Sequence, residues 1–350
     1  MKKQLLILLL AAALTFSLTP EARAAGGYSD VPEGHWAVEN IERATELGLF
    51  QGVGGGKFGL GQPITRAAFA TTLVRLFGWQ AVNPEHTSYT DVPRSSWYYS
   101  AVETVLANDA VAASGQTFRP NDELTRGEMA SMLVRALGYT SLAGGAGDYD
   151  TPFTDVTVNK GFVTVAYDLG IMDGKGKGRF DPDASATREQ AATVLVRVYD
   201  QHTAKSTALT STAGYQTINI STPIAQPGTE VPVTPLEPLP DLYASLRRMK
   251  NSGEDMSKMV LRLMAGGVRT ITDAGGNIVS GSELISAKEV QEVLGHKDVK
   301  TFYSEQYDSA YCIYPPNAYQ TATVWYQSDE SMAAKLQLVR LFGVTKYVLE

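Results

Sequence analysis

The 350-residue sequence has one cysteine, four widely spaced histidines and no apolar run as long as a membrane span. A lone Cys312 excludes an intramolecular disulfide framework and any cluster of cysteine metal ligands. The histidines show no ligand spacing, so we expect neither a metal site nor a cofactor. Positive charge is also scarce, because 30 Lys and Arg stand against 37 Asp and Glu, for a net charge of −7. This balance excludes a general affinity for nucleic acid, whose phosphates require a basic surface.

The first residues have the pattern of an export signal. A basic start is followed by an apolar run from Leu5 to Leu18 and by the small-x-small sequence Ala22-Arg23-Ala24. The run is shorter than the roughly 20 residues that a membrane-spanning helix needs. Residues 1–24 are therefore predicted to be a secretory signal peptide, with an uncleaved anchor as the alternative. Cleavage would remove three basic residues and one acidic residue, changing the net charge from −7 to −9 and leaving no transmembrane segment.

One pattern of about sixty residues occurs three times, at residues 27–83, 87–142 and 150–201. Each copy begins with an aromatic residue that precedes Asp-Val, and a Thr-Arg pair later starts an apolar helical pattern. A phenylalanine precedes each arginine by eight residues, and the arginines are 60 and 62 residues apart. The equivalent positions are Asp30, Asp91 and Asp155; Phe58, Phe118 and Phe180; and Arg66, Arg126 and Arg188. Three matches in the same register indicate an internal repeat.

Each copy is predicted to form a helix, a Gly-rich loop and a second helix. One such unit is too small to bury a core alone, whereas three stacked units can share one. Trp36 and Trp97 lie six residues after their aspartates and are interpreted first as packing residues. Gly52 and Gly174 lie in the loops, six residues before their phenylalanines. The fold class over residues 27–201 is therefore expected to be mainly α.

The Thr-Arg pair has a physical meaning of its own. Its threonine suits a helix N-cap, and Thr125…Glu128 and Thr187…Gln190 have the spacing of a capping box. The arginine occupies the first helical position, where a positive charge opposes the helix dipole. Free N–H groups at a helix start, beside a guanidinium, suit a carboxylate ligand. Two interpretations remain open: each arginine binds an acidic ligand, or it pairs with the motif aspartate and only ties neighbouring repeats together.

These residues resemble the S-layer homology (SLH) domain, present here as a triplet. The shared pattern is aromatic-x-Asp-Val, then Trp, then Gly-hydrophobic, then Phe-x-Pro, then Ile/Leu-Thr-Arg, and it covers about half of the chain. The resemblance implies a three-fold pseudo-symmetric helical prism that binds secondary cell wall polymers of Gram-positive bacteria. Those polymers typically carry pyruvate ketals. In the family, the Thr-Arg arginine meets the ketal carboxylate, aided by the aspartate, the tryptophan and loop glycines.

Carried over to this chain, the resemblance nominates a set of ligand-binding residues. They are Arg66, Arg126, Arg188, Asp30, Asp91, Asp155, Trp36, Trp97, Gly52 and Gly174. The copies also depart from the family pattern. Ala68 replaces a glutamate in the first copy, Ala112 stands at the loop-glycine position of the second, and Gly161-Phe162 replaces the tryptophan in the third. The three sites are therefore expected to be unequal.

The second half of the chain changes character at about residue 203. Residues 203–240 are rich in Thr and Ser and contain six prolines from Pro223 onward, which favours a semi-extended spacer. Residues 241–350 are predicted to form a small α/β domain of unknown role. The expected elements are helices within 241–263, a hairpin of 268–271 with 277–280, a helix over 286–294, strands over 310–314 and 321–326, a helix over 331–342 and a strand over 344–349. Cys312 lies in an apolar run and is expected to be a buried, inert thiol.

Residues 300–350 are similar to the C-terminal end of family 18 glycoside hydrolases, in which a Val-Trp-Tyr strand leads to Ser-x-x-x-Lys on a helix that ends at Gly-Val. The catalytic Asp-x-x-Asp-x-Asp-x-Glu motif of that family is absent from this sequence. About 110 residues are also too few for its barrel. The carboxylates Glu305, Asp308, Asp329 and Glu330 form no recognisable acid–base arrangement, so no catalytic residue is nominated.

The sequence is therefore interpreted as an exported, non-catalytic protein of a Gram-positive cell wall or S-layer. Its SLH triplet is expected to bind pyruvylated wall polysaccharide non-covalently and to display residues 241–350 at the surface. Other surface-layer proteins are further candidate partners. The alternative is a surface glycan hydrolase of family 18 type, acting on chitin or peptidoglycan, with the triplet as its targeting module.

Overall fold

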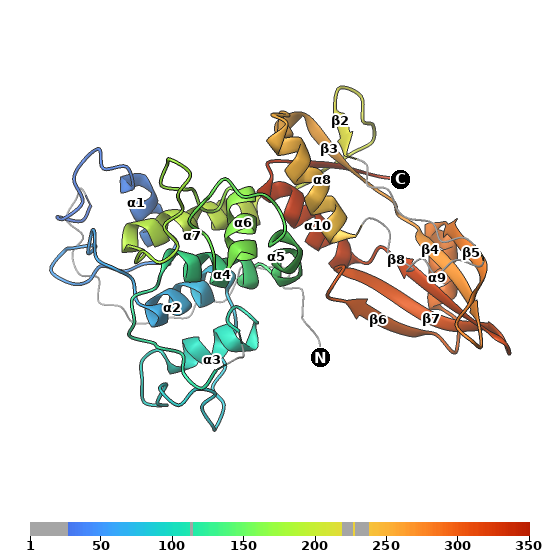
Figure 1. Cartoon of the computed structure of the whole chain (residues 1–350), viewed down its shortest axis with the longest axis horizontal. Coiled ribbons are helices and arrows are strands. Elements are labelled where there is room, and N and C mark those ends of the chain that lie inside the picture. The colour runs from blue at the N-terminus through green and yellow to red at the C-terminus, as the bar shows by residue number, and fades with distance from the viewer. Residues whose placement is uncertain (1–26, 113–114, 219–226, 228–237) are drawn as a thin grey trace. The chain divides into compact units, whose positions relative to one another are not determined.

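The computed structural model describes residues 27–112, 115–218, 227 and 238–350 (Figure 1). The predicted signal peptide, residues 1–24, lies outside this part. The chain divides into two compact units. The first unit comprises Met1–Ala107, Ala113–Thr125 and Ala184–Arg197, and the second comprises Asn108–Ala112, Arg126–Asp183 and Val198–Glu350. The boundary between the units therefore passes through the second and third repeats.

Each repeat contains the helix–loop–helix pattern that the sequence predicts. The helices are α1 (Val38–Glu46) and α2 (Arg66–Phe77) in the first repeat, α3 (Tyr99–Ala107) and α4 (Arg126–Ala136) in the second, and α6 (Lys160–Asp168) and α7 (Arg188–Thr203) in the third. A short additional helix, α5 (Thr140–Ala146), precedes the third repeat. The repeat phenylalanines are fully buried, with exposed fractions of 0%, 1% and 0% for Phe58, Phe118 and Phe180.

A closed ring of backbone hydrogen bonds joins the three repeats within the first unit. The N–H of Ile64 donates to the carbonyl of Ala186 (2.9 Å), that of Ala186 donates to Leu124 (2.8 Å), and that of Leu124 returns to Ile64 (2.9 Å). All three side chains are buried. Since these residues lie two positions before the repeat arginines, the ring places the start of each Thr-Arg segment beside the neighbouring repeat.

The C-terminal part of the second unit contains two sheets. A four-stranded parallel sheet has the order β1-β9-β3-β2, and a five-stranded antiparallel sheet has the order β5-β4-β8-β7-β6 (Figure 1). The strands are β1 (Thr207–Leu209), β2 (Gln216–Ile218), β3 (Met259–Leu263), β4 (Gly267–Asp273), β5 (Ile278–Ile285), β6 (Lys300–Ser304), β7 (Ser309–Asn317), β8 (Gln320–Tyr326) and β9 (Lys346–Leu349). The helices are α8 (Leu239–Asn251), α9 (Ala287–Leu294) and α10 (Asp329–Leu341), with a 3₁₀ turn at Met256–Lys258. The expected α/β class is confirmed, but the segment expected to be helical throughout 241–263 ends in strand β3.

One face of the five-stranded sheet packs against residues of α9. Val290 and Val293 of this helix join Cys312, Ala322 and Val324 of the sheet in one apolar cluster. Cys312 is fully buried, and burial raises the pKa of its thiol to about 11. At neutral pH the thiol is therefore protonated and inert, as the sequence indicates.

The structure differs from the spacer interpretation within residues 203–240. Strands β1 and β2 lie in this segment, where β1 pairs with β9 and β2 pairs with β3, both in parallel. Pairing in the sheet provides hydrogen-bond partners for the backbone groups of β1 and β2. The Thr/Ser-rich composition of the segment does not predict this pairing. The remaining predicted spacer residues 219–226 and 228–237 lie outside the described part.

Within the second unit, helix α8 is bonded to the end of α6 through Asp168. The buried Asp168 carboxylate accepts hydrogen bonds from the Tyr243 hydroxyl (2.6 Å) and the Arg247 Nε (2.8 Å). The Lys250 Nζ donates to the Asp168 carbonyl (2.6 Å). Residues 239–251 therefore join the third repeat directly. Among the described helices, none combines the length and apolarity that a membrane crossing requires.

Candidate functional site

The three repeat arginines each meet the next repeat at a site that we call a corner. A corner consists of the arginine of one repeat and the phenylalanine and motif aspartate of the next. They are the Arg66 corner (Arg66, Phe118, Asp91), the Arg126 corner (Arg126, Phe180, Asp155) and the Arg188 corner (Arg188, Phe58, Asp30).

In every corner the guanidinium lies over the phenylalanine ring and bonds to the same residue's carbonyl. The Nε of Arg66 donates to Phe118 (2.8 Å), that of Arg126 to Phe180 (2.9 Å) and that of Arg188 to Phe58 (2.9 Å). The guanidinium carbons lie 5.0, 4.6 and 5.0 Å from the ring centroids. This combination of a charged hydrogen bond and a cation–π contact fixes each side chain in place.

The motif aspartates accept hydrogen bonds from the backbone N–H groups of the same phenylalanines. The Asp30 carboxylate accepts N–H bonds from Phe58 (2.7 Å), Gly59 (2.8 Å) and Leu60 (2.9 Å). Asp91 accepts from Phe118 and the residue after it, and Asp155 does the same for Phe180. Aspartate and arginine are therefore joined through the phenylalanine backbone, an arrangement that the proposed Asp–Arg pairing did not include.

The first backbone N–H of α2 and of α7 is not free for an anion, contrary to the expectation from sequence. The backbone N–H of Arg66 donates to the Asp122 carbonyl (3.0 Å), and that of Arg188 donates to the Gln62 carbonyl (2.9 Å). The capping box expected at Thr187…Gln190 is not formed, since the Thr187 Oγ1 and Gln190 Oε1 have no hydrogen-bond partner. The Asp122 and Gln62 carbonyls satisfy the first N–H of each helix, whereas a capping side chain serves the second or third N–H, as the Thr65 Oγ1 does for the Ala68 N–H in α2 (3.2 Å).

The three corners differ in how far their arginine side chains are exposed to solvent. Arg66 and Arg188 are half-buried, whereas Arg126 has an exposed fraction of only 6%. A second donor of Arg126, Nη2, binds the carbonyl of Asp173 (2.7 Å), and the Nη2 of Arg188 binds Gln51 (2.8 Å). The sequence analysis did not nominate these carbonyls, although both residues directly precede the loop glycines Gly174 and Gly52.

The loop glycines have a packing role. A Cβ on Gly52 would lie 2.7 Å from the Lys57 carbonyl oxygen and 2.9 Å from the Tyr28 ring. A Cβ on Gly174 would lie 2.5 Å from the Phe153 ring and 2.9 Å from the Arg179 carbonyl oxygen. The absence of a side chain lets each loop close against the aromatic residue of the Asp-Val motif.

The tryptophans are not packing residues, which corrects the first interpretation. Trp36 is 59% exposed and Trp97 is 69% exposed. Such exposure is costly for the largest apolar side chain unless a partner covers it. In the third repeat no tryptophan could replace Gly161, because a Cβ there would lie 1.8 Å from the Ala143 carbonyl oxygen of α5. The added helix α5 thus explains why the third copy departs from the pattern.

The electrostatics of Asp30 give a testable pH dependence. Burial alone would raise its pKa, but the N–H bonds from Leu60, Phe58 and Gly59 outweigh burial and lower the pKa below the ordinary value. A lowered carboxyl pKa stabilises the fold above the ordinary value near pH 4, and this stability is lost as the pH falls through the lowered pKa.

Asp30→Asn is therefore expected to lower the free energy of unfolding by about 1–2 kcal/mol at pH 7, because the amide loses the charge that strengthens three hydrogen bonds. The difference from the wild type should shrink by pH 2–3. Urea denaturation followed by circular dichroism at both pH values measures it, with the exposed Glu33→Gln as control. A loss that is equally large at both pH values would rule out the charge as its source.

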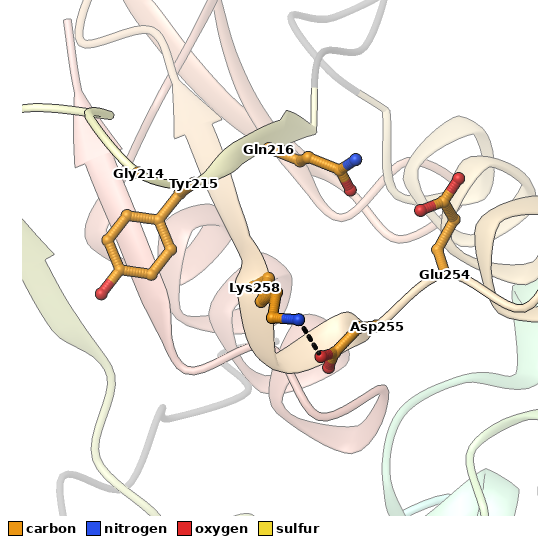
Figure 2. A pocket seen from close by; sticks show the side chains of 6 residues that line it. All are labelled: Gly214, Tyr215, Gln216, Glu254, Asp255 and Lys258. Atoms are coloured by element: carbon orange, nitrogen blue, oxygen red, sulfur yellow. Dashed lines mark ion pairs between the residues drawn. The ribbon is translucent and has the colours of Figure 1, made fainter.

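A second candidate site is a surface depression at the start of β2 and β3 (Figure 2). It is lined by Gly214, Tyr215, Gln216, Glu254, Asp255 and Lys258. Asp255 is already engaged by the Ser257 hydroxyl (2.6 Å) and by Lys258 (3.1 Å), and these contacts lower its pKa. The depression therefore presents a solvated ion pair and no acid held ready for proton transfer. The described residues also contain no group of three or more side chains that could hold a metal ion.

Comparisons with known proteins agree with the repeat. The S-layer homology domain family matches residues 27–70, 88–130 and 152–192. A surface layer protein of Brevibacillus choshinensis is 36% identical over 135 residues, which cover 37% of this chain and 12% of that protein. An endoglucanase of Bacillus sp. (strain KSM-635) is 32% identical over 209 residues, covering 55% of this chain and 22% of that protein. The chain thus spans less than a quarter of the length of these relatives.

Solved structures with some likeness to the chain include glycan-degrading enzymes. The spore cortex-lytic enzyme SleL of Bacillus megaterium is 16% identical, with 39% of this chain and 30% of that chain covered and a TM-score of 0.31. A family GH18 chitinase of Cycas revoluta is 19% identical, with 30% and 32% covered and a TM-score of 0.26. Such low scores assign neither a fold nor an activity to residues 241–350. The family match, in contrast, falls on the predicted repeats, and the chain therefore carries three S-layer homology domains within residues 27–201.

Proposed function

We propose that this chain is a non-covalent cell-wall anchor that binds pyruvylated secondary cell wall polysaccharide at the surface of a Gram-positive bacterium. The SLH triplet would supply the binding, and residues 241–350 would be displayed by it. The relatives named as surface layer proteins support this placement. Export through a signal peptide at residues 1–24 and contacts with other surface-layer proteins belong to the same proposal.

The observation that carries the proposal is the combination of two half-buried arginines, Arg66 and Arg188, with the exposed tryptophans of the first two repeats. Arg66 and Arg188 are held by carbonyl and ring contacts yet keep part of their surface in solvent. A ketal carboxylate is the chemistry that such a preordered guanidinium recognises. Trp36 and Trp97 add flat apolar surfaces of the kind that a sugar ring covers.

The cyclic contacts between repeats are also consistent with a three-fold arrangement. Arg66 reaches the second repeat, Arg126 reaches the third, and Arg188 returns to the first. We propose the three-fold pseudo-symmetric prism of the family for residues 27–201 on this basis. The proposed ligand sites are the corners, with Asp30, Asp91 and Asp155 acting through the phenylalanine loops.

The experiment is sedimentation of purified residues 25–350 with bacterial sacculi before and after the wall polymer is removed by hydrofluoric acid. We expect most of the protein to pellet with intact sacculi and little with stripped ones. A Trp36→Ala, Trp97→Ala double variant should bind roughly thirtyfold more weakly, since each of the two aromatic contacts is worth about 1 kcal/mol. Equal binding to intact and stripped sacculi would refute the anchor mechanism.

A further inference from the structure

One backbone position distinguishes the three corners by charge. The residue after each repeat phenylalanine has a positive φ, 85° for Gly59, 59° for Arg119 and 55° for Asp181. Its N–H donates in each case to the motif aspartate (2.8, 2.7 and 2.8 Å). The position is therefore structurally the same in all three repeats, yet it is neutral in the Arg188 corner, basic in the Arg66 corner and acidic in the Arg126 corner.

The Arg126 corner is poorly suited to an anionic ligand. Burial lowers the pKa of Arg126, while the carboxylates of Asp181, Asp173 and Asp155 oppose this shift, which places three negative charges around one guanidinium. Basic side chains already engage these carboxylates: Arg179 is bonded to Asp181 (2.6 Å) and lies 3.7 Å from Asp155, and Lys250 interacts electrostatically with Asp173. The carboxylates would repel a ligand carboxylate. The guanidinium is also hard to reach, because the Arg126 side chain is 94% buried.

The Arg66 corner differs in having a basic side chain, Arg119, at the position after the phenylalanine. Arg119 is 51% exposed, and its Nη1 lies 3.7 Å from Asp122, whose carbonyl accepts the N–H of Arg66. The guanidinium of Arg119 therefore lies close to the start of α2. Burial and Glu103 raise the pKa of Tyr89, whereas Arg66 lowers it, so the phenol is within electrostatic reach of Arg66.

The Arg188 corner is intermediate. Tyr28 and the carboxylates of Asp30 and Glu189 act on Arg188. Both carboxylates are engaged by backbone N–H groups, those of the Phe58 loop for Asp30 and that of Gly61 for Glu189 (3.0 Å). A Cβ at Gly59 would lie 2.9 Å from the Gln62 Oε1 and 3.2 Å from the Arg188 Nε, so a side chain there would have to displace these groups.

We infer that the Arg66 corner, with Arg119 as an additional ligand contact, is the primary site for a carboxylate-bearing sugar, that the Arg188 corner is a second site, and that the Arg126 corner is a structural joint. The inference rests on the proposed wall-polymer binding and names the residues that discriminate among its sites. The third repeat, whose Asp155 and Phe180 complete the Arg126 corner, is also the one in which α5 excludes a tryptophan.

Arg119→Asp tests the inference with little risk to the fold, because the structure already holds aspartate at the equivalent position, Asp181, with nearly the same φ. The probe is a methyl hexopyranoside carrying a pyruvate ketal, titrated calorimetrically into residues 25–350 at low salt. We expect two bound sugars per wild-type chain, and in the variant one of them bound roughly tenfold more weakly, since two units of charge are changed at an exposed contact. The difference should fall toward twofold in 1 M NaCl.

The exposed Arg248→Asp is the matched control, because it changes the net charge equally but lies on α8, outside the corners. Three sugars per wild-type chain, or unchanged affinities in Arg119→Asp, would overturn the inference while leaving wall binding intact. Equal weakening by both variants would assign the effect to net charge and would also overturn it. Failure of the wild type to bind intact sacculi would remove the proposed function and this inference together.

Discussion

Gly161→Ala is expected to lower the free energy of unfolding by about 3 kcal/mol or more. The added Cβ would lie 1.8 Å from the Ala143 carbonyl oxygen, 2.9 Å from its carbonyl carbon and 3.2 Å from the Gly147 nitrogen. All three are backbone atoms, so no side-chain rotation relieves the overlap. Helices α5 and α6 would have to separate, and overpacking that moves backbone is among the costliest mutational effects.

Gly144→Ala is the matched control, because Gly144 lies on α5 and its Cβ would meet nothing within 4 Å. It should be neutral or stabilising by up to about 1 kcal/mol, through helix propensity alone. Urea denaturation of residues 25–350 measures both variants. If the two substitutions had similar effects, the close approach of α5 to α6 would be refuted, and with it the explanation for the missing tryptophan.

Arg126→Ala is expected to cost about 3 kcal/mol of folding free energy. It would leave the carbonyls of Phe180 and Asp173 without their donor and remove the cation that covers the Phe180 ring. It would also leave three nearby carboxylates without their central positive charge. Loss of one partner from a buried charged network typically costs several kcal/mol.

Arg126→Lys separates charge from geometry, because lysine keeps the charge but cannot reproduce the fixed fork that reaches two carbonyls. It should recover only part of the loss. Arg119→Ala, at an exposed position, should change stability by less than about 0.5 kcal/mol. An effect of Arg126→Ala as small as that of Arg119→Ala would show that the corner does not hold the repeats together.

The repeat register could be predicted from the sequence because the same residue types recur at fixed spacing. Asp30, Phe58 and Arg66 and their counterparts were identified in this way, and the structure brings them together at corners. The spacing does not predict which residues of neighbouring repeats contact each other. The spacing leaves open whether each arginine binds an acidic ligand or pairs with the motif aspartate, and it does not predict the contacts with the carbonyl and ring of the next repeat's phenylalanine, since these depend on how the repeats pack against one another.

The remaining differences have local physical causes. Thr187 and Gln190 have the spacing of a capping box, but the Thr187 Oγ1 and the Gln190 Oε1 have no hydrogen-bond partner, and the first N–H of α7 donates to the Gln62 carbonyl of the first repeat. The size and apolar character of Trp36 and Trp97 predict burial in the core, whereas the structure shows both side chains exposed. Strands β1 and β2 lie within a stretch whose composition is typical of a linker. They are strands because their backbones pair with β9 and β3, and the side chains of the stretch do not indicate this pairing.

We propose that Arg66 and Arg188, at two of the joints between SLH repeats, hold the acidic sugars of the wall. The most direct test is release of the sacculus-bound chain by a free methyl glycoside carrying a pyruvate ketal, compared with the methyl ester of the same ketal. We expect concentration-dependent release by the acid and retention in the presence of the ester. Equal release by both compounds, or retention in the presence of both, would contradict this proposal.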